Sequence, residues 1–269
     1  VGKFRPPFSL ENTYDPGTRL VPEMSPLATQ LAPANSLGLM ASGHNGNWDW
    51  RAGWFSSDRD ENLPGVEGSG YLLASIGYLF QGGTGKAPPL GEERRGPRAN
   101  AYQRWHLDYI YNIDEGGSGS IPMGYKHLLS TGIRVSEGRL DVLGDFLLGN
   151  GEDASTAWGL TLQGSYWLMD DAVRLVARYH YADTDDEAGL LSGWGIPSPK
   201  SDTLQAFQYP VVRTGDELHS FYGGLNFHIF GDYLLLQTGL EYRILKNNES
   251  LTEPDYDSWL WQAGGRAAF

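Results

Sequence analysis

Arginine side chains recur at alternate positions of several short segments. Arg174 and Arg178 fall on one side of such a segment, with only Val176 between them on that side. A guanidinium group donates paired hydrogen bonds to phosphate or carboxylate oxygens. The spacing leaves two interpretations open: contact with solute anions, or pairing with neighbouring carboxylates across strands.

Other reactive residue types do not assemble into an enzyme-like pattern. His219 and Ser220 are adjacent, so in an extended strand they point to opposite faces and cannot act together. The six histidines lack metal-ligand spacing, and no H-E-x-x-H, nucleophile elbow or P-loop is present. Four clustered carboxylates could bind calcium, although a solvated acidic loop is the commoner outcome: Asp183, Asp185, Asp186 and Glu187. We expect no catalytic residue, no metal site and no cofactor.

The elements that must position the arginines alternate apolar and polar side chains at a period of two, which indicates β-strands. In residues 233–245, Leu236 and Leu240 share one face, and Glu241 and Arg243 share the other. Twelve segments qualify as strands: 1–4, 36–43, 47–55, 71–80, 102–113, 126–136, 139–148, 156–169, 173–182, 217–230, 233–245 and 258–269.

Composition narrows the class of protein further. The 269 residues include 36 Gly, 10 Phe, 15 Tyr and 9 Trp, and no cysteine. This aromatic content excludes a disordered chain, and the absence of cysteine excludes a disulfide framework. The longest nearly apolar run, residues 71–80, is shorter than the roughly 18 to 20 residues of a membrane-spanning helix. The net charge of −13 argues against a nucleic-acid binder.

These features favour an all-β fold, a transmembrane antiparallel β-barrel occupying residues 1–269, over a soluble sandwich. Charged side chains stand at mid-strand opposite bulky aromatic ones, and barrels use aromatic residues in their interfacial girdles. Ten residues at about 3.3 Å each, tilted about 40°, cover close to the roughly 25 Å apolar band of an outer membrane. Tight turns alternate with long connections, except that 81–101 is long where a turn is expected.

Sorting the charges by strand face predicts a polar face with a net positive charge. Five anions fall on it: Asp49, Asp108, Asp141, Asp145 and Glu241. Nine cations fall on it: Lys3, Arg51, Arg104, Arg134, Arg139, Arg174, Arg178, Arg243 and Arg266. Most other carboxylates fall in loops. A positive pore wall favours anions.

The stretches VGKFRPPFSLENTYD, EMSPLATQLAPANSLGLMASG and WDWRAGWFSSDRD resemble the phosphate-selective porin family, the O and P porins. In that family, V-G-x-F runs into K-x-P-F-S/G-L-E, and a long loop then leads to a strand of the L-G-V/L-M type. The matching residues of the first motif are Gly2, Phe4, Pro7, Phe8, Leu10 and Glu11. Those of the loop and the next strand are Glu23, Pro26, Ala32, Pro33, Leu37, Gly38 and Met40.

The resemblance implies a porin of the bacterial outer membrane, with a barrel of about sixteen strands. Four earlier strands and most of a fifth would then lie upstream of this sequence, and a self-contained twelve-stranded barrel is the alternative. It further implies a homotrimer in outer-membrane lipid that passes small hydrophilic solutes, including anions such as phosphate. The pore-lining residues would be Arg51, Arg104, Arg134, Arg139, Arg174, Arg178, Arg243 and Arg266.

Residues 5–35 would form the constriction loop of this porin and contribute Arg5, Arg19 and Glu23. Met24 and Asn35 stand where the family carries basic residues, so we expect only a weak anion preference. The terminal aromatic Phe269 resembles the signal that the outer-membrane insertion machinery reads. A structural barrel that anchors or encloses a partner protein is the alternative function.

Overall fold

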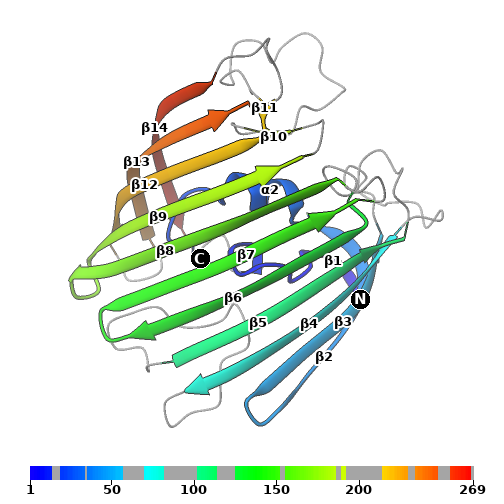
Figure 1. Ribbon diagram of the computed structural model, residues 1–269. Coiled ribbons are helices and arrows are strands. Elements are labelled where there is room, and N and C mark those ends of the chain that lie inside the picture. The colour runs from blue at the N-terminus through cyan, green and yellow to red at the C-terminus, as the bar shows by residue number, and fades with distance from the viewer. Residues whose placement is uncertain are drawn as a thin grey trace.

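Twelve strands form one antiparallel sheet in the computed structural model, in the order β1-β2-β3-β4-β5-β6-β7-β8-β9-β12-β13-β14 (Figure 1). The structure describes residues 1–13, 19–33, 35–56, 70–81, 102–113, 125–151, 155–185, 189–191, 214–229, 234–247 and 255–267. Figure 1 shows that the sheet is strongly curved and that α2 lies against its inner side.

The bounds of the strands in this sheet are β1 Gly2–Phe4, β2 Ser36–Asn45, β3 Trp48–Ser56, β4 Gly70–Gln81, β5 Tyr102–Asn112, β6 His127–Glu137, β7 Leu140–Asn150, β8 Thr156–Met169, β9 Val173–Thr184, β12 Glu217–His228, β13 Leu234–Lys246 and β14 Tyr256–Ala267. The short strands β10 (Leu190–Leu191) and β11 (Thr214–Gly215) form a separate pair. Two short helices, α1 (Leu10–Thr13) and α2 (Pro26–Leu31), lie between β1 and β2.

The all-β class and the twelve predicted strands are confirmed, and each strand of the twelve-stranded sheet overlaps its predicted segment. The short strands β10 and β11 were not predicted. Every neighbouring pair is antiparallel. The sheet is not closed, because β1 and β14 stand at its two edges. Among the described residues, no helix has the length and apolar character that a membrane-crossing helix needs.

Tight turns join several of the strands where the sequence predicts them. Asn45 pairs with Trp48, and Gly46 between them has φ of 61°, the left-handed region that glycine adopts without steric cost. Glu137 pairs with Leu140 across a second two-residue loop. Residues 231–232, between the predicted strands 217–230 and 233–245, lie outside the described residues, and so do residues 82–101 of the predicted long connection 81–101.

The two faces of the sheet are inverted relative to a soluble protein. Asp108 and Glu241 are fully buried, whereas Leu240, next to Glu241 in the same strand, is 52% exposed. The exposed face carries large apolar side chains from many strands: Leu72, Phe80, Ile133, Leu162, Leu175, Phe221, Leu236, Trp259 and Trp261. The predicted alternation is confirmed, and the polar side of the sheet is the buried side.

The buried side, which we call the inward face, has an apolar zone and a polar zone. The apolar zone lies at the strand ends opposite the tight turns and includes Phe55, Tyr71, Ile110, Leu128, Leu147 and Leu245. Phe8 and α2 pack against this zone. The polar zone is the remainder of the inward face, and its buried side chains are largely charged or polar, among them Arg104, Arg134, Asp141, Arg174, Arg178 and Glu241. The period-two pattern did not predict this division, because both zones alternate with the same outward apolar residues.

The segment that covers the inward face consists of residues 5–13 and 19–33, which we call the strap. It carries α1 and α2. Ser25 caps α2, because its side chain accepts a hydrogen bond from the N–H of Ala28, and Pro26 occupies the first position of the helix. The strap falls within residues 5–35, the segment for which the sequence predicts a constriction loop.

Candidate functional site

The first part of the strap is held by two buried carboxylates of the sheet. The N–H of Ser9 donates to Asp108 Oδ2 at 3.0 Å, and the N–H of Leu10 donates to Asp145 Oδ2 at 2.8 Å. Serine hydroxyls of β4 and β6 donate to the remaining oxygens of these carboxylates. The ring of His106 lies 3.3 Å from Asp108 and 3.5 Å from Asp145. Each carboxylate therefore has several partners at the place where α1 begins.

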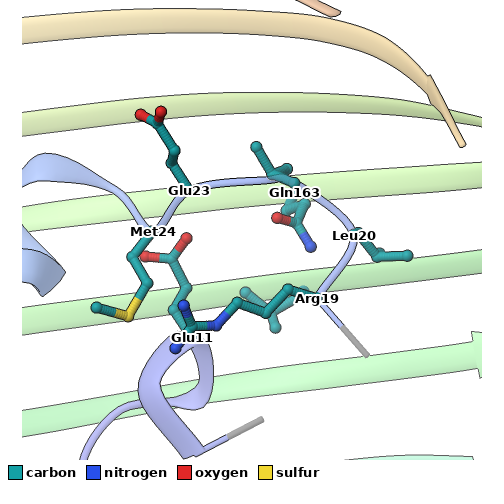
Figure 2. A pocket seen from close by; sticks show the side chains of 8 residues that line it. Glu11, Arg19, Leu20, Glu23, Met24 and Gln163 are labelled. Carbon is teal, nitrogen blue, oxygen red and sulfur yellow. The ribbon is translucent and has the colours of Figure 1, made fainter. Parts of the chain in front are cut away.

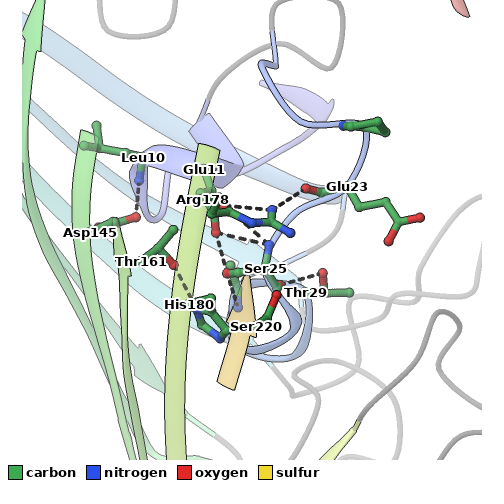
Figure 3. A network of polar contacts seen from close by, with 12 residues as sticks. Leu10, Glu11, Glu23, Ser25, Thr29, Asp145, Thr161, Arg178, His180 and Ser220 are labelled. Carbon is green, nitrogen blue, oxygen red and sulfur yellow. Dashed lines mark hydrogen bonds and ion pairs between the residues drawn. The ribbon is translucent and has the colours of Figure 1, made fainter. Parts of the chain in front are cut away.

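Glu11 joins the two parts of the strap to each other and to the sheet (Figure 3). Its carboxylate accepts hydrogen bonds from the N–H and the hydroxyl of Ser25, which begins α2. Arg178 Nη1 of β9 lies 3.5 Å from Glu11 Oε1. The side chains of Glu11 and Arg178 are both nearly inaccessible to solvent, so this junction is buried.

The second part of the strap is held by its backbone carbonyls. Asparagine, glutamine and arginine side chains of β9, β12, β13 and β14 donate to them, which satisfies carbonyl groups that no secondary structure satisfies. The contacts run from Gln237 to Arg19 and Leu20 (both 2.9 Å), Asn226 to Leu20 (2.8 Å), Arg266 to Arg19 and Pro22 (3.1 and 3.3 Å), and Arg178 to Glu23 (2.6 Å).

Beneath this part of the strap, Glu241 collects donors from several strands. Arg178 Nη2 lies 3.2 Å from it and Arg243 Nη2 lies 2.7 Å from it. Ser220 and Gln262 also donate to the Glu241 carboxylate. The Glu241 and Arg178 side chains are fully buried. Because two guanidinium groups share this carboxylate, charge pairing offsets the cost of burying all three.

Glu23 projects from the strap toward the same arginines. Its carboxylate accepts from Arg243 at 3.5 Å and from Gln262 at 3.2 Å. It lines a hollow of about 20 Å³, large enough for one water molecule, with Glu11, Arg19 and Gln163 (Figure 2). Burial raises the pKa of Glu23 to about 7, and the positive charge of Arg243 opposes that rise.

Three further predicted arginines of the polar zone pair with carboxylates. Arg104 lies 3.0 Å from Asp49. Arg134 and Arg174 share the carboxylate of Asp141, at 2.5 and 3.0 Å. These contacts correspond to the second interpretation of the sequence, pairing across strands. Arg51 is half-buried in β3, and the predicted loop residues Arg5 and Arg19 are half-buried in the strap.

Two cations do not lie where the sequence predicted. Arg139 was expected on the polar face, but it occupies the turn between β6 and β7, where it is 46% exposed and pairs with Asp170 at 2.7 Å. A turn residue leaves the alternation of the strand, so parity does not place it. Lys3 is also exposed, because its neighbour Phe4 turns inward and packs against Phe55.

The His219 and Ser220 side chains, considered from the sequence as a catalytic pair, do not lie together. His219 contacts Tyr179 and Glu217, whereas Ser220 is buried against Glu241, so the expected placement of this pair on opposite faces is confirmed. In the described part of the chain, no group of His, Asp or Glu residues could hold a metal ion. Asp186, Glu187 and the terminal Phe269 lie outside the described residues.

Sequence reasoning missed the residues that dock the strap. Alternation puts Asn226 and Gln237 on the polar faces of their strands, but nothing in their spacing indicates that they bind backbone carbonyls. Glu11 matches the first motif of the porin resemblance, but the motif does not indicate which groups its carboxylate binds. Contacts to backbone atoms leave no pattern in side-chain types, which explains why no sequence signal revealed them.

No protein-family model, no curated protein and no solved structure matches this chain.

Proposed function

We propose that this chain forms the wall of a bacterial outer-membrane pore for the passive diffusion of small hydrophilic solutes. The observation that carries the proposal is the inversion of the sheet. Its exposed face presents leucine, phenylalanine and tryptophan, and its inward face presents buried charges. Lipid is the solvent that stabilises such an exposed face, because burial of apolar area in the bilayer removes it from water.

The ends of the strands add a second argument for lipid contact. Near the tight turns, Trp48 and Tyr78 pack with ring centroids 4.6 Å apart. Near the opposite strand ends, Trp158 packs on Tyr181 at 5.1 Å. Aromatic rings at two levels are typical of the interfacial girdles of outer-membrane barrels. The sheet would then close with further strands, as the resemblance to the O and P porins implies.

The charge of the inward face supports a weak preference for anions such as phosphate. Within the described residues, the strap and the polar zone carry nine guanidinium groups, those of Arg5, Arg19, Arg51, Arg104, Arg134, Arg174, Arg178, Arg243 and Arg266. They carry seven carboxylates, those of Glu11, Glu23, Asp49, Asp108, Asp141, Asp145 and Glu241. An excess of two positive charges favours anions only modestly, because most guanidinium groups already have a carboxylate partner.

Planar-bilayer recording of the purified chain tests this function. We expect stepwise conductance, and in a potassium chloride gradient a reversal potential that indicates a small preference for chloride. A preference for potassium would contradict the proposed anion preference while leaving the pore itself intact.

A structural barrel that encloses or anchors a partner protein is the second candidate. It is favoured by one observation, the nearly complete burial of polar-zone side chains such as Asp108 and His180 under the strap. A chain that inserts into the bilayer but stays electrically silent would support this candidate over the porin.

A further inference from the structure

The two carboxylates of the strap stand in different surroundings. Glu11 is bound by the N–H and hydroxyl of Ser25 and lies beside Arg178. Glu23 has longer contacts, to Arg243 and Gln262, and its side chain is 17% exposed at the edge of the hollow in Figure 2. Glu23 is therefore the strap carboxylate that can respond to the solution.

Charged and titratable groups face Glu23 from every element packed against it. They are Arg178 of β9, Tyr222 of β12, Glu241 and Arg243 of β13, Arg266 of β14, and Glu11 and Arg19 of the strap. Arg178 and Arg243 attract a negative charge on Glu23, whereas Glu241 repels it.

The net charge around the two buried arginines depends on whether Glu23 is ionised. Arg178 and Arg243 are the guanidinium groups, and Glu11, Glu23 and Glu241 are the carboxylates in contact with them. Figure 3 shows Arg178 beside Glu11. With Glu23 ionised, the five groups carry one net negative charge. With Glu23 neutral, their charges cancel.

We propose that Glu23 is a specificity-determining residue of the pore: its ionised carboxylate offsets the positive charge of Arg243, and its loss or protonation increases the preference for anions. This inference rests on the proposed pore function. The excess positive charge of the strap and polar zone rises from two to three when Glu23 is neutral.

The direction of the pH effect follows from the surroundings of this carboxyl. Burial raises the pKa of Glu23 to about 7, so the group becomes neutral as the pH falls from 8 to 6. The preference for chloride should increase over the same range and should decrease again when the pH returns to 8.

The test uses the full chain in planar bilayers with a potassium chloride gradient at pH 8 and pH 6. We expect Glu23→Gln to raise the chloride-to-potassium permeability ratio about twofold at pH 8, as one charge a few ångströms from a hydrated ion would. Glu23→Gln should also show a smaller change between the two pH values than the wild type. The difference isolates Glu23, because every other titratable group is shared.

Glu137→Gln is the matched control, since Glu137 is an exposed glutamate at the end of β6. It should behave like the wild type at both pH values. Open channels whose selectivity is the same in the wild type and in Glu23→Gln would overturn the inference and leave the pore function standing.

A second measurement does not require conductance. In protein labelled with 13C at the glutamate carboxyl, the NMR signal that disappears in Glu23→Gln should titrate near pH 7. Titration of that signal near pH 4.5 would overturn the inference even if the chain formed no channel.

Discussion

The apolar zone and the polar zone of the inward face hold the strap by different forces. In the apolar zone, α2 buries Leu27 and Leu31 completely, and the contact resembles the core of a soluble domain. In the polar zone, the strap lies on side-chain amides and guanidinium groups that contact its backbone. Burial of apolar area does not depend on ionisation, whereas the contacts of the Glu23 carboxylate with Arg243 and Gln262 in the polar zone do. The comparison predicts a fixed end of the strap and an adjustable one.

The largest expected effect comes from removing Arg178, which contacts both Glu11 of the strap and Glu241 of the sheet. Arg178→Met leaves Glu241 and Glu11 buried without their shared partner, and should lower the free energy of unfolding by about 3–5 kcal/mol. Urea unfolding in detergent micelles measures it.

Arg139→Met is the control, because the ion pair of Arg139 with Asp170 is exposed. It should change stability by less than about 1 kcal/mol. Equal effects of the two substitutions would show that Arg178 does not hold the polar zone together.

The fixed end of the strap is tested by shortening one apolar side chain of α2. Leu27→Ala leaves a cavity beside Gly159 of β8 and should cost about 2–5 kcal/mol in the same unfolding experiment. Leu20→Ala, in the part of the strap over the polar zone, should cost less, because Leu20 is 6% exposed and belongs to a smaller apolar cluster than the fully buried Leu27. A larger loss of unfolding free energy for Leu20→Ala than for Leu27→Ala would contradict the expectation that α2 is the fixed end of the strap.

The close contact between Tyr222 and Gly239, under the strap, predicts a substitution with an intermediate effect on stability. Tyr222 lies across Gly239, where an added Cβ would stand 2.5 Å from the phenol ring and 2.7 Å from the carbonyl of Gly223. Gly239→Ala should displace Tyr222, cost about 1–3 kcal/mol, and increase cleavage of the strap by added protease.

Gly164→Ala provides the matched control, since a Cβ at Gly164 meets nothing within 4 Å. Its unfolding midpoint and its protease pattern should equal those of the wild type. Increased cleavage in both variants would mean that Tyr222 does not secure the strap.

The smallest expected effect is a pH dependence of stability from Glu23. The folded pKa of about 7 lies above the ordinary value of 4.5, so the unfolded chain releases this proton first and stability falls as the pH rises from 4.5 to 7. Glu23→Gln removes this loss and should be more stable than the wild type at pH 8, by on the order of 1 kcal/mol after allowance for solvent screening.

At pH 4 the two proteins should be equally stable, and unfolding curves at both pH values provide the measurement. A wild type that is more stable than Glu23→Gln at pH 8 would show that pairing with Arg243 outweighs burial.

The amino-acid sequence by itself determined the strands and their faces. Alternation placed Arg104, Arg174, Arg178 and Arg243 on the polar side, and the structure confirms all four positions. It misplaced Lys3, because a strand as short as β1 does not show which of its faces is the polar one, and it misplaced Arg139, because a turn residue leaves the alternation of the strand.

Only the tertiary structure decided what those arginines contact. The carboxylate partners of Arg174 and Arg178 come from other strands and from a strap more than a hundred residues away in the chain. Period-two alternation is a local property of an extended backbone, so each segment shows it alone. Ion pairs and carbonyl docking depend on which segments meet in space, and local spacing carries no record of that.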